Sequence, residues 1–243
     1  MYLLFDYFHR KTKDKNEGGL VHIPQDNSLW PESWKTVTYK ILERAKRIVL
    51  ERHIPHTADF YTIAAGRTSP SAFAPGSLTL EQLSHLLQLS YGEKNKDAVA
   101  RRPVPSGGAR YPLEMYVLAW DVQGLEPGVY HYNIKEHALE HLFWKDFSKA
   151  DIMRYVSYPW VETGGALLVM TGIFARSTQK YGSRGYRYTL LEAGHVGQMI
   201  YLNAKYLGFN ARALAGTNDL ALEDLLDING SEESVVYAIG LGK

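Results

Sequence analysis

The densest group of chemically active side chains lies in nine residues, Lys180 to Tyr188, which hold three cationic side chains, three tyrosines and two glycines. An unperturbed tyrosine is a poor base at neutral pH, because its pKa of about 10 keeps the hydroxyl protonated. The neighbouring ammonium of Lys180 would favour the phenolate of Tyr181 and lower this pKa. The segment could then supply a general base, and a solvated basic turn with cation–π contacts is the alternative interpretation.

A second segment, Gly66 to Pro70, reads Gly-Arg-Thr-Ser-Pro and places a guanidinium beside two hydroxyl groups. Arginine presents a planar fork of N–H donors that matches the oxygens of a phosphate. The segment is therefore a candidate phosphate site, although so short a pattern also fits an exposed turn.

Two further segments would let the backbone approach a ligand closely. Pro105 to Pro112 contains the adjacent glycines Gly107 and Gly108 and leads directly into a predicted strand. Such a loop can come within hydrogen-bonding distance of a flat ligand, and a tight turn before a strand is the plainer interpretation. It is not a dinucleotide fingerprint, because the third glycine and the strand-then-helix context are missing. Leu214 to Asn218 offers similar backbone access at Gly216.

Several other kinds of chemistry are disfavoured. The 243 residues contain no cysteine, which excludes disulfides, thiolate metal sites and cysteine nucleophiles. His137 and His141 on a predicted strand would lie about 13 Å apart, too far to share a metal ion. His195 is interpreted as a packed or interface histidine, so no metal site is expected. Ser106 lacks the G-x-S-x-G elbow and the partners that acyl transfer needs.

Charge and hydropathy indicate the setting of the protein. A formal net charge of +1 gives no field that would attract nucleic acid. The apolar run Met1 to Phe8 is interrupted by Asp6 and is too short for a signal peptide or a membrane span. The charged stretch Lys11 to Gly19 is expected to be an exposed loop. We therefore expect a cytoplasmic protein that binds neither nucleic acid nor membrane.

The elements that must position these segments can be predicted from periodicity. Thr79 and Gln82 have the spacing of a capping box before a leucine-rich helical face, and Gly92 supplies a stop. A long helix is predicted from Tyr186 to Leu207, roughly 33 Å in length, with small residues that suit packing in the core or at a subunit interface. Strands are predicted at Leu113 to Trp120, Gly128 to Tyr132, Ala138 to Phe143, Ala166 to Phe174, Asn210 to Ala215 and Ser234 to Ile239.

A short helix after residue 218 and the stretch before residue 51 are also predicted. Asp219 is expected to cap a helix from Leu220 to Leu226, and Trp34 to Leu50 suits a partly exposed arm. The run Ala166 to Phe174 is continuously apolar, so this strand should be buried on both faces. Helices and strands alternate without a strict βαβ rhythm, which favours the α+β class.

Three stretches resemble the signature segments of the SagB-type dehydrogenases, which belong to the nitroreductase-like superfamily that uses flavin mononucleotide (FMN). They are Pro105 to Tyr116, Gly124 to Tyr132 and Arg184 to Gln198, in the family's order and with similar spacing, and the resemblance covers roughly residues 30 to 243. It implies an α+β fold with a central, mostly antiparallel sheet flanked by helices, and a homodimer with a long central helix that binds FMN at the dimer interface. Residues 1–60 would then form an N-terminal extension, and residues 61–243 the FMN-binding domain.

The resemblance also implies which residues contact the flavin. Arg67, Thr68 and Ser69 match the segment that holds the flavin phosphate, although Pro70 and Ser71 stand where relatives often carry a second basic residue. The loop at Ser106 matches one that reaches the flavin ring, often from the partner subunit. The remaining implied FMN-binding positions are Pro105, Ser106, Gly107, Gly108, Gln198, Ala215, Gly216 and Lys243.

The adjacent Lys180 and Tyr181 resemble the pair that azoline oxidases use for proton transfer, with Tyr181 as base and Lys180 as its electrostatic partner. The implied activity is oxidation of azoline rings in a modified peptide to azoles, by hydride transfer to the flavin N5. Cyclodehydratase proteins and the peptide substrate are the implied partners. Two alternatives stay open: an NAD(P)H-dependent nitro or quinone reductase, and a flavin-binding scaffold subunit without catalysis of its own.

Overall fold

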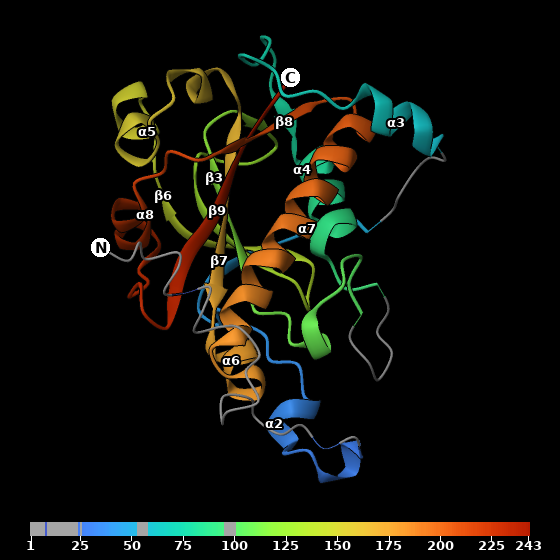
Figure 1. Cartoon of the computed structure of the whole chain (residues 1–243). Helices are drawn as coiled ribbons and strands as arrows, with labels where there is room; N and C mark the ends of the chain where they lie inside the picture. Colours follow the sequence, from blue (N-terminus) through green and yellow to red (C-terminus); the bar gives the residue numbers. More distant parts are fainter. Residues whose placement is uncertain (1–7, 9–23, 25, 53–57, 95–100) are drawn as a thin grey trace, which may run out of the picture.

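A seven-stranded sheet forms the centre of the molecule (Figure 1). The computed structural model describes residues 8, 24, 26–52, 58–94 and 101–243, so the expected loop at 11–19 and residues 1–7 lie outside the described part. In spatial order the strands are β1 (Lys46–Val49), β6 (Ala138–Trp144), β5 (Gly128–Asn133), β3 (Leu113–Ala119), β7 (Ala166–Ile173), β9 (Glu233–Gly242) and β8 (Asn210–Leu214). All neighbouring strands in this sheet are antiparallel. The predicted α+β class with a central, mostly antiparallel sheet is confirmed.

A second, short sheet pairs β2 (Leu78–Thr79) with β4 (Val122–Gln123) in parallel. It joins the entry of the first large helix to the turn that follows β3. Within the stretch 34–50, which the sequence suggested as an arm, β1 pairs with β6 and extends the main sheet by one edge strand.

The central strands β3 and β7 are buried on both faces, because each face of the sheet carries its own hydrophobic core. Met115 and Val117 of β3 belong to one core, while Tyr116 and Leu118 belong to the other. Side chains alternate across a strand, so a strand covered on both sides needs apolar residues at every position. This is why the run at Ala166 reads as continuously apolar, as predicted.

The first core lies under two helices, α4 (Leu80–Tyr91) and α7 (Arg184–Tyr206), which also pack on each other. The predicted capping box is present: the Thr79 hydroxyl accepts from the Gln82 backbone N–H at 3.1 Å, and the Gln82 side chain accepts from the Thr79 N–H at 3.2 Å. The long helix begins two residues before its predicted start. Its glycine at position 197 packs on Tyr237 of β9, since an added Cβ would lie 2.5 Å from that ring.

The second core lies under α5 (Lys149–Tyr155), the 3-10 helix η3 (Pro159–Thr163) and α8 (Asp219–Leu226). The predicted cap of α8 is wrong by one residue, because the side chain of Asn218 accepts from the Ala221 N–H. Asp219 occupies the first turn instead, where its negative charge still complements the helix dipole.

The remaining short elements lie around the two ends of α7. Helix α3 (Phe60–Gly66) lies near its C-terminal end and α6 (Ala175–Tyr181) precedes its N-terminal end (Figure 1). Helices η1 (Asn27–Leu29) and α2 (Glu32–Lys35) lie below α6 in that view. The 3-10 turn η2 (Gly107–Ala109) precedes β3. Across these described segments, no helix is both long enough and apolar enough to span a membrane.

The assumption that His137 and His141 share a strand is wrong. His137 has a positive φ of 51° and lies in the turn before β6. Its ring nitrogens contact the Tyr132 hydroxyl at 2.7 Å and the Ser84 hydroxyl at 3.1 Å. It therefore links β5, α4 and the turn.

Candidate active site

Lys180 and Tyr181 lie at the end of α6, where the chain turns into α7. Gly182 makes this turn with a φ of 56°, and Gly185 lets the two helices touch, because a Cβ there would lie 2.6 Å from the Ser177 backbone carbon. The tight corner directs the Lys180 side chain inward, where only 1% of it is exposed. Lys180 is therefore not solvated, but it makes the cation–π contacts that the alternative interpretation of this segment included.

The glycine loop, residues 105–112 before β3, lies against this corner between α6 and α7. Gly108 has a φ of 61°, and an added Cβ would overlap the Tyr181 hydroxyl and lie 3.2 Å from the Lys180 Nζ. A Cβ on Gly107 would lie 3.4 Å from the ring of Tyr188. The structure thus brings together two segments that the sequence predicted as functional, the glycine loop and the lysine–tyrosine pair.

The buried carboxyl group of Glu192 contacts Ser106 of the glycine loop. The Ser106 hydroxyl accepts from the Tyr111 N–H at 2.8 Å, and Tyr91 donates to Glu192 of α7 at 2.7 Å. Burial raises the pKa of Glu192, against the opposing effect of hydrogen bonds from Ser106 and Tyr91. Sequence reasoning did not single out Glu192, although its place four residues after Tyr188 on the same helical face was a usable signal.

The expected lowering of the Tyr181 pKa by Lys180 is wrong for this structure. Burial raises the pKa of Tyr181 and Tyr188 adds to this, while Arg110 opposes it. Burial also lowers the pKa of Lys180, with a contribution from Arg110. The reason is geometric: the Lys180 Nζ lies 5.6 Å from the centre of the Tyr181 ring but 3.4 Å from that of Trp30.

A second group of predicted residues surrounds the C-terminal end of α7. The Arg67 guanidinium lies 5.6 Å from the centre of the Tyr201 ring and donates to the Ser69 hydroxyl at 3.4 Å. Thr68 and Ser69 are exposed. Lys205 lies against the same turn, since a Cβ on Gly66 would be 2.8 Å from its Cε.

Two more cations lie at this end of the helix. Arg212 of β8 donates to the carbonyls of Pro70 and Ser71 at 2.7 and 2.9 Å. Lys243 donates to Gln82 at 3.1 Å, beside the point where Gln82 binds the Leu207 carbonyl. Lys205 and Arg212 were not predicted as site residues, although an arginine inside an otherwise apolar strand was a signal for Arg212. Together these groups, with the predicted Arg67, form a basic cluster suited to a phosphate.

Ala215 and Gly216 lie at the end of β8, apart from the glycine loop. The Gly216 carbonyl accepts from the Ser157 N–H at 2.9 Å, and its backbone packs closely on Tyr158. Ala215 lines a cavity of about 410 Å³. Gln198 is exposed on the outer face of α7, where Gly194 has nothing within 4 Å of an added Cβ.

In a single chain the predicted residues other than Gln198, Ala215 and Gly216 form two groups at opposite ends of α7. Tyr188 contacts the glycine loop and Tyr201 contacts Arg67, and the two tyrosines are 13 residues apart on the helix. A rise of 1.5 Å per residue makes this separation about 20 Å. The glycine loop and the basic cluster of one chain therefore do not form one continuous site.

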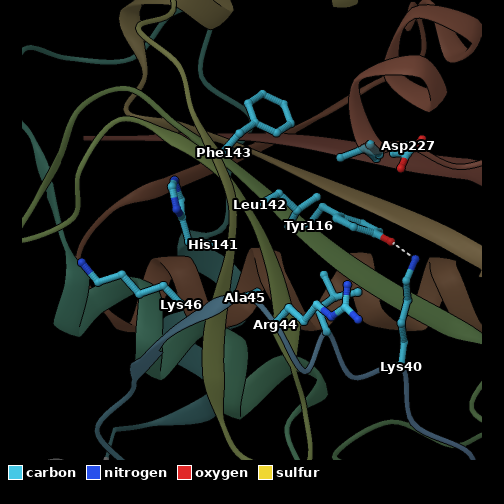
Figure 2. Close-up of a pocket in the computed structure, with 11 residues that line it drawn as sticks. Lys40, Arg44, Ala45, Lys46, Tyr116, His141, Leu142, Phe143 and Asp227 are labelled. Carbon is cyan, nitrogen blue, oxygen red and sulfur yellow. Dashed lines mark hydrogen bonds between the residues drawn. The ribbon is translucent and has the colours of Figure 1, made fainter.

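A separate cavity of about 480 Å³ contains none of the predicted site residues (Figure 2). It is lined by parts of the segment before β1, by β6 and by the end of α8. In it, Lys40 binds the Tyr116 hydroxyl and Glu233, the latter at 2.6 Å. Burial and Glu233 raise the pKa of Tyr116 well above its usual value.

The chain is similar to known proteins over most of its length. The family model described as the Nitroreductase family matches residues 64–243. The Methanocaldococcus jannaschii protein MJ1384, assigned as a nitroreductase, is 33% identical over 162 residues, which cover 67% of this chain and 81% of that protein.

Two peptide-processing proteins are also similar. The trifolitoxin-processing protein TfxB of Rhizobium leguminosarum is 32% identical over 68% of this chain and 47% of its own length. The microcin B17-processing protein McbC of Escherichia coli is 31% identical over 58% of this chain and 54% of its own length. This chain therefore matches about half the length of these two relatives.

Solved structures share the fold. An assigned nitroreductase from Anabaena variabilis superposes with a TM-score of 0.73 at 25% identity, over 97% of this chain and 45% of that chain. A chain of the E. coli microcin synthetase McbBCD complex, with truncated pro-MccB17 bound, gives 0.62 at 22% identity over 88% and 86%. An Exiguobacterium sibiricum protein solved in complex with FMN gives 0.55 at 14% identity over 78% and 90%.

Proposed function

This chain belongs to the nitroreductase family, and from that premise we propose that it is an FMN-dependent oxidoreductase of the SagB type that oxidises azoline rings in a modified peptide. The observation that carries the proposal is the meeting of the buried Lys180 and the half-buried Tyr181 with the exposed Gly108. Support for a peptide substrate comes from the names of TfxB and McbC, both of which process peptides.

The chemical character of the residues fits FMN. Arg67, Ser69, Arg212 and Lys243 supply the guanidinium, hydroxyl and ammonium donors that a phosphate needs, and Thr68 lies between the first two. Gly107 and Gly108 carry no side chains, and a Cβ added to them would meet Tyr188 and Tyr181 respectively. A flat ring system fits against such a backbone, with Pro105, Ser106, Ala215, Gly216 and Gln198 as further proposed contacts.

The distance between the two groups favours a site completed by a second copy of the chain. Because the glycine loop and the basic cluster lie about 20 Å apart along α7, we propose a homodimer in which one chain provides the loop and the other the cluster. The outer face of α7 suits this contact, since Leu190 and Leu191 are 38% and 57% exposed and Gly194 leaves open space beside them.

Oxidation of an azoline to an azole removes two hydrogens from adjacent ring carbons and leaves a double bond between them. When bound, FMN would accept one of them as hydride. The other leaves as a proton and needs a base in the protein. The Lys180–Tyr181 pair, which meets Gly108 at this corner, is the proposed source of that base.

The proposal is tested with purified protein loaded with FMN, by its visible spectrum and by anaerobic mixing with an azoline compound. We expect Lys180→Met and Tyr181→Phe to keep bound flavin and to lose bleaching by the azoline. Tyr61→Phe, at a tyrosine that is 81% exposed, is the matched control and should behave as wild type. Unchanged bleaching in both site variants, or a protein that stays colourless with excess FMN, would overturn the proposal.

The assigned activity of MJ1384 favours one alternative, an NAD(P)H-dependent nitro or quinone reductase. Its signature in the same experiment is rapid bleaching of flavin by NAD(P)H with no reaction of the azoline. Cyclodehydratase proteins are the proposed partners, because McbC belongs by name to the processing of microcin B17 and a similar chain is part of the McbBCD synthetase complex. A cytoplasmic location also stays a prediction.

A further inference from the structure

The N-terminal segment Asp26–Thr36, which contains η1 and α2, folds over the end of α6. The Lys180 Nζ lies 3.4 Å from the centre of the Trp30 ring and 5.7 Å from that of Trp34. The two indoles meet edge to face at 6.4 Å. The ammonium of Lys180 is therefore covered by two aromatic rings that come from a distant part of the sequence.

Within the described chain, aromatic rings alone compensate this ammonium for its burial: those of Trp30 and Trp34, and that of Tyr181 at 5.6 Å. The Lys180 Nζ is shielded from solvent and makes no hydrogen bond to any residue that the structure describes. Burying a cation without an acceptor is unfavourable. The electron-rich face of a tryptophan attracts a desolvated ammonium more strongly than an exposed one, so Trp30 is the main group that holds Lys180 in place.

The covering segment is fastened to the body of the protein at Arg110. The Arg110 guanidinium donates to the carbonyls of Ser33 and Trp34, each at 2.7 Å, and to that of Thr36 at 2.9 Å. It also donates to the Arg176 carbonyl of α6 at 3.2 Å. One side chain thus joins the segment to the helix that carries Lys180.

Few other contacts of the described residues hold the segment. Helices η1 and α2 contain no buried residue, and Leu29 is 68% exposed. A peptide of this length does not form stable helices alone. Among the described residues, Arg110 and the contact between Trp30 and the ammonium are the main contacts that hold it over Lys180.

We propose that Trp30 is a positioning residue for Lys180, held over it by Arg110, and that it keeps the ammonium directed at Gly108 and Tyr181. The proposal rests on the proposed function only in naming Lys180 as a reacting group. The contact itself can be tested without any turnover.

The test is amine labelling of the full-length protein with acetic anhydride, with the rate at each lysine read by mass spectrometry. We expect Trp30→Leu, which fills space without an aromatic face, to speed labelling of Lys180 at least fivefold. Trp30→Phe, which keeps a ring, should stay within twofold of wild type. Arg110→Lys, which loses the fork of donors, should fall between them.

Trp144→Leu is the matched control, because Trp144 covers Lys46 on the surface at 5.8 Å. It should change labelling of Lys46 and leave Lys180 as in wild type. Circular dichroism and thermal unfolding confirm that each variant is folded. Equal labelling of Lys180 in wild type, Trp30→Leu and Trp30→Phe would overturn the proposal, and so would equal acceleration in both variants, since bulk alone would then explain the protection.

Turnover supplies a second readout. In azoline oxidation, Trp30→Leu should lower kcat at least fivefold with flavin content and KM near wild type, and Trp30→Phe should restore it. If labelling responds as expected but wild type oxidises no azoline, the proposed function fails and the contact stands. If labelling does not respond, the inference fails whatever the activity.

Discussion

Replacing Gly108 by alanine should damage the site far more than the fold. Gly108 and Gly208 both have a left-handed backbone conformation, with φ values of 61° and 77°. The left-handed conformation costs a residue with a Cβ roughly 1–2 kcal/mol. For a chain of this size, 1 kcal/mol lowers Tm by about 2–4 °C, so each alanine variant should lose about 2–8 °C.

The two positions differ in their surroundings. An added Cβ at Gly208 meets nothing within 4 Å, whereas one at Gly108 would overlap the Tyr181 hydroxyl and press on Lys180. Tyr181 must then move on the order of 1 Å, and a displacement of that size can reduce turnover about 100-fold. The corresponding loss of transition-state stabilisation is about 2.7 kcal/mol.

The assay compares both variants by calorimetry and by azoline oxidation with FMN-loaded protein. Gly208→Ala should match wild type in kcat, and Gly108→Ala should be about 100-fold slower at a similar Tm. If Gly108→Ala turned over as fast as Gly208→Ala, the contact between the loop and the pair would have no part in catalysis.

Three further predictions follow from other features. Gly194→Trp should abolish the dimer and flavin binding together, by sedimentation and absorbance, while Gly194→Ala keeps both; a flavin-bound dimer of the tryptophan variant would contradict the proposed interface. Burial alone would lower the pKa of His131, but hydrogen bonds to Glu114 and Glu140 raise it overall. Because the folded pKa exceeds the unfolded value of about 6.5, this stabilisation is complete below pH 6.5 and lost as pH rises through the folded pKa. Urea unfolding from pH 6 to 9 should show the free energy of unfolding decline in wild type and not in His131→Gln, and an equal change with pH in both proteins would refute this. Thr79→Ala should cost about 1 kcal/mol by removing the observed capping box, and an unchanged Tm would show that the cap contributes nothing.

Much of the fold could be predicted because its signals are local. The capping box at Thr79, the alternation along the strands and the spacing of α7 each depend on residues within one or two turns of each other. The boundaries of β3, β6 and β8 differ from prediction by one residue at most. The cap of α8 was misplaced because Asn218 and Asp219 are equally good cap residues, and backbone geometry alone chose between them.

The candidate site was less predictable, because burial depends on distant segments. The sequence indicated that Lys180 lies beside Tyr181, but not that Trp30 would cover its ammonium or that burial would raise the pKa of Tyr181. The signal for Trp30 was only a pair of tryptophans four residues apart. Nothing local relates that pair to α6.

By itself the sequence determined which elements form and which side chains are available for chemistry, since helix and strand periodicity and residue type are properties of short stretches. Only the tertiary structure decided where those stretches meet: the glycine loop at one end of α7 and the basic cluster at the other, about 20 Å away. The physical reason is that proximity, desolvation and pKa arise from packing between residues far apart in the chain, and helix α7 sets their spacing.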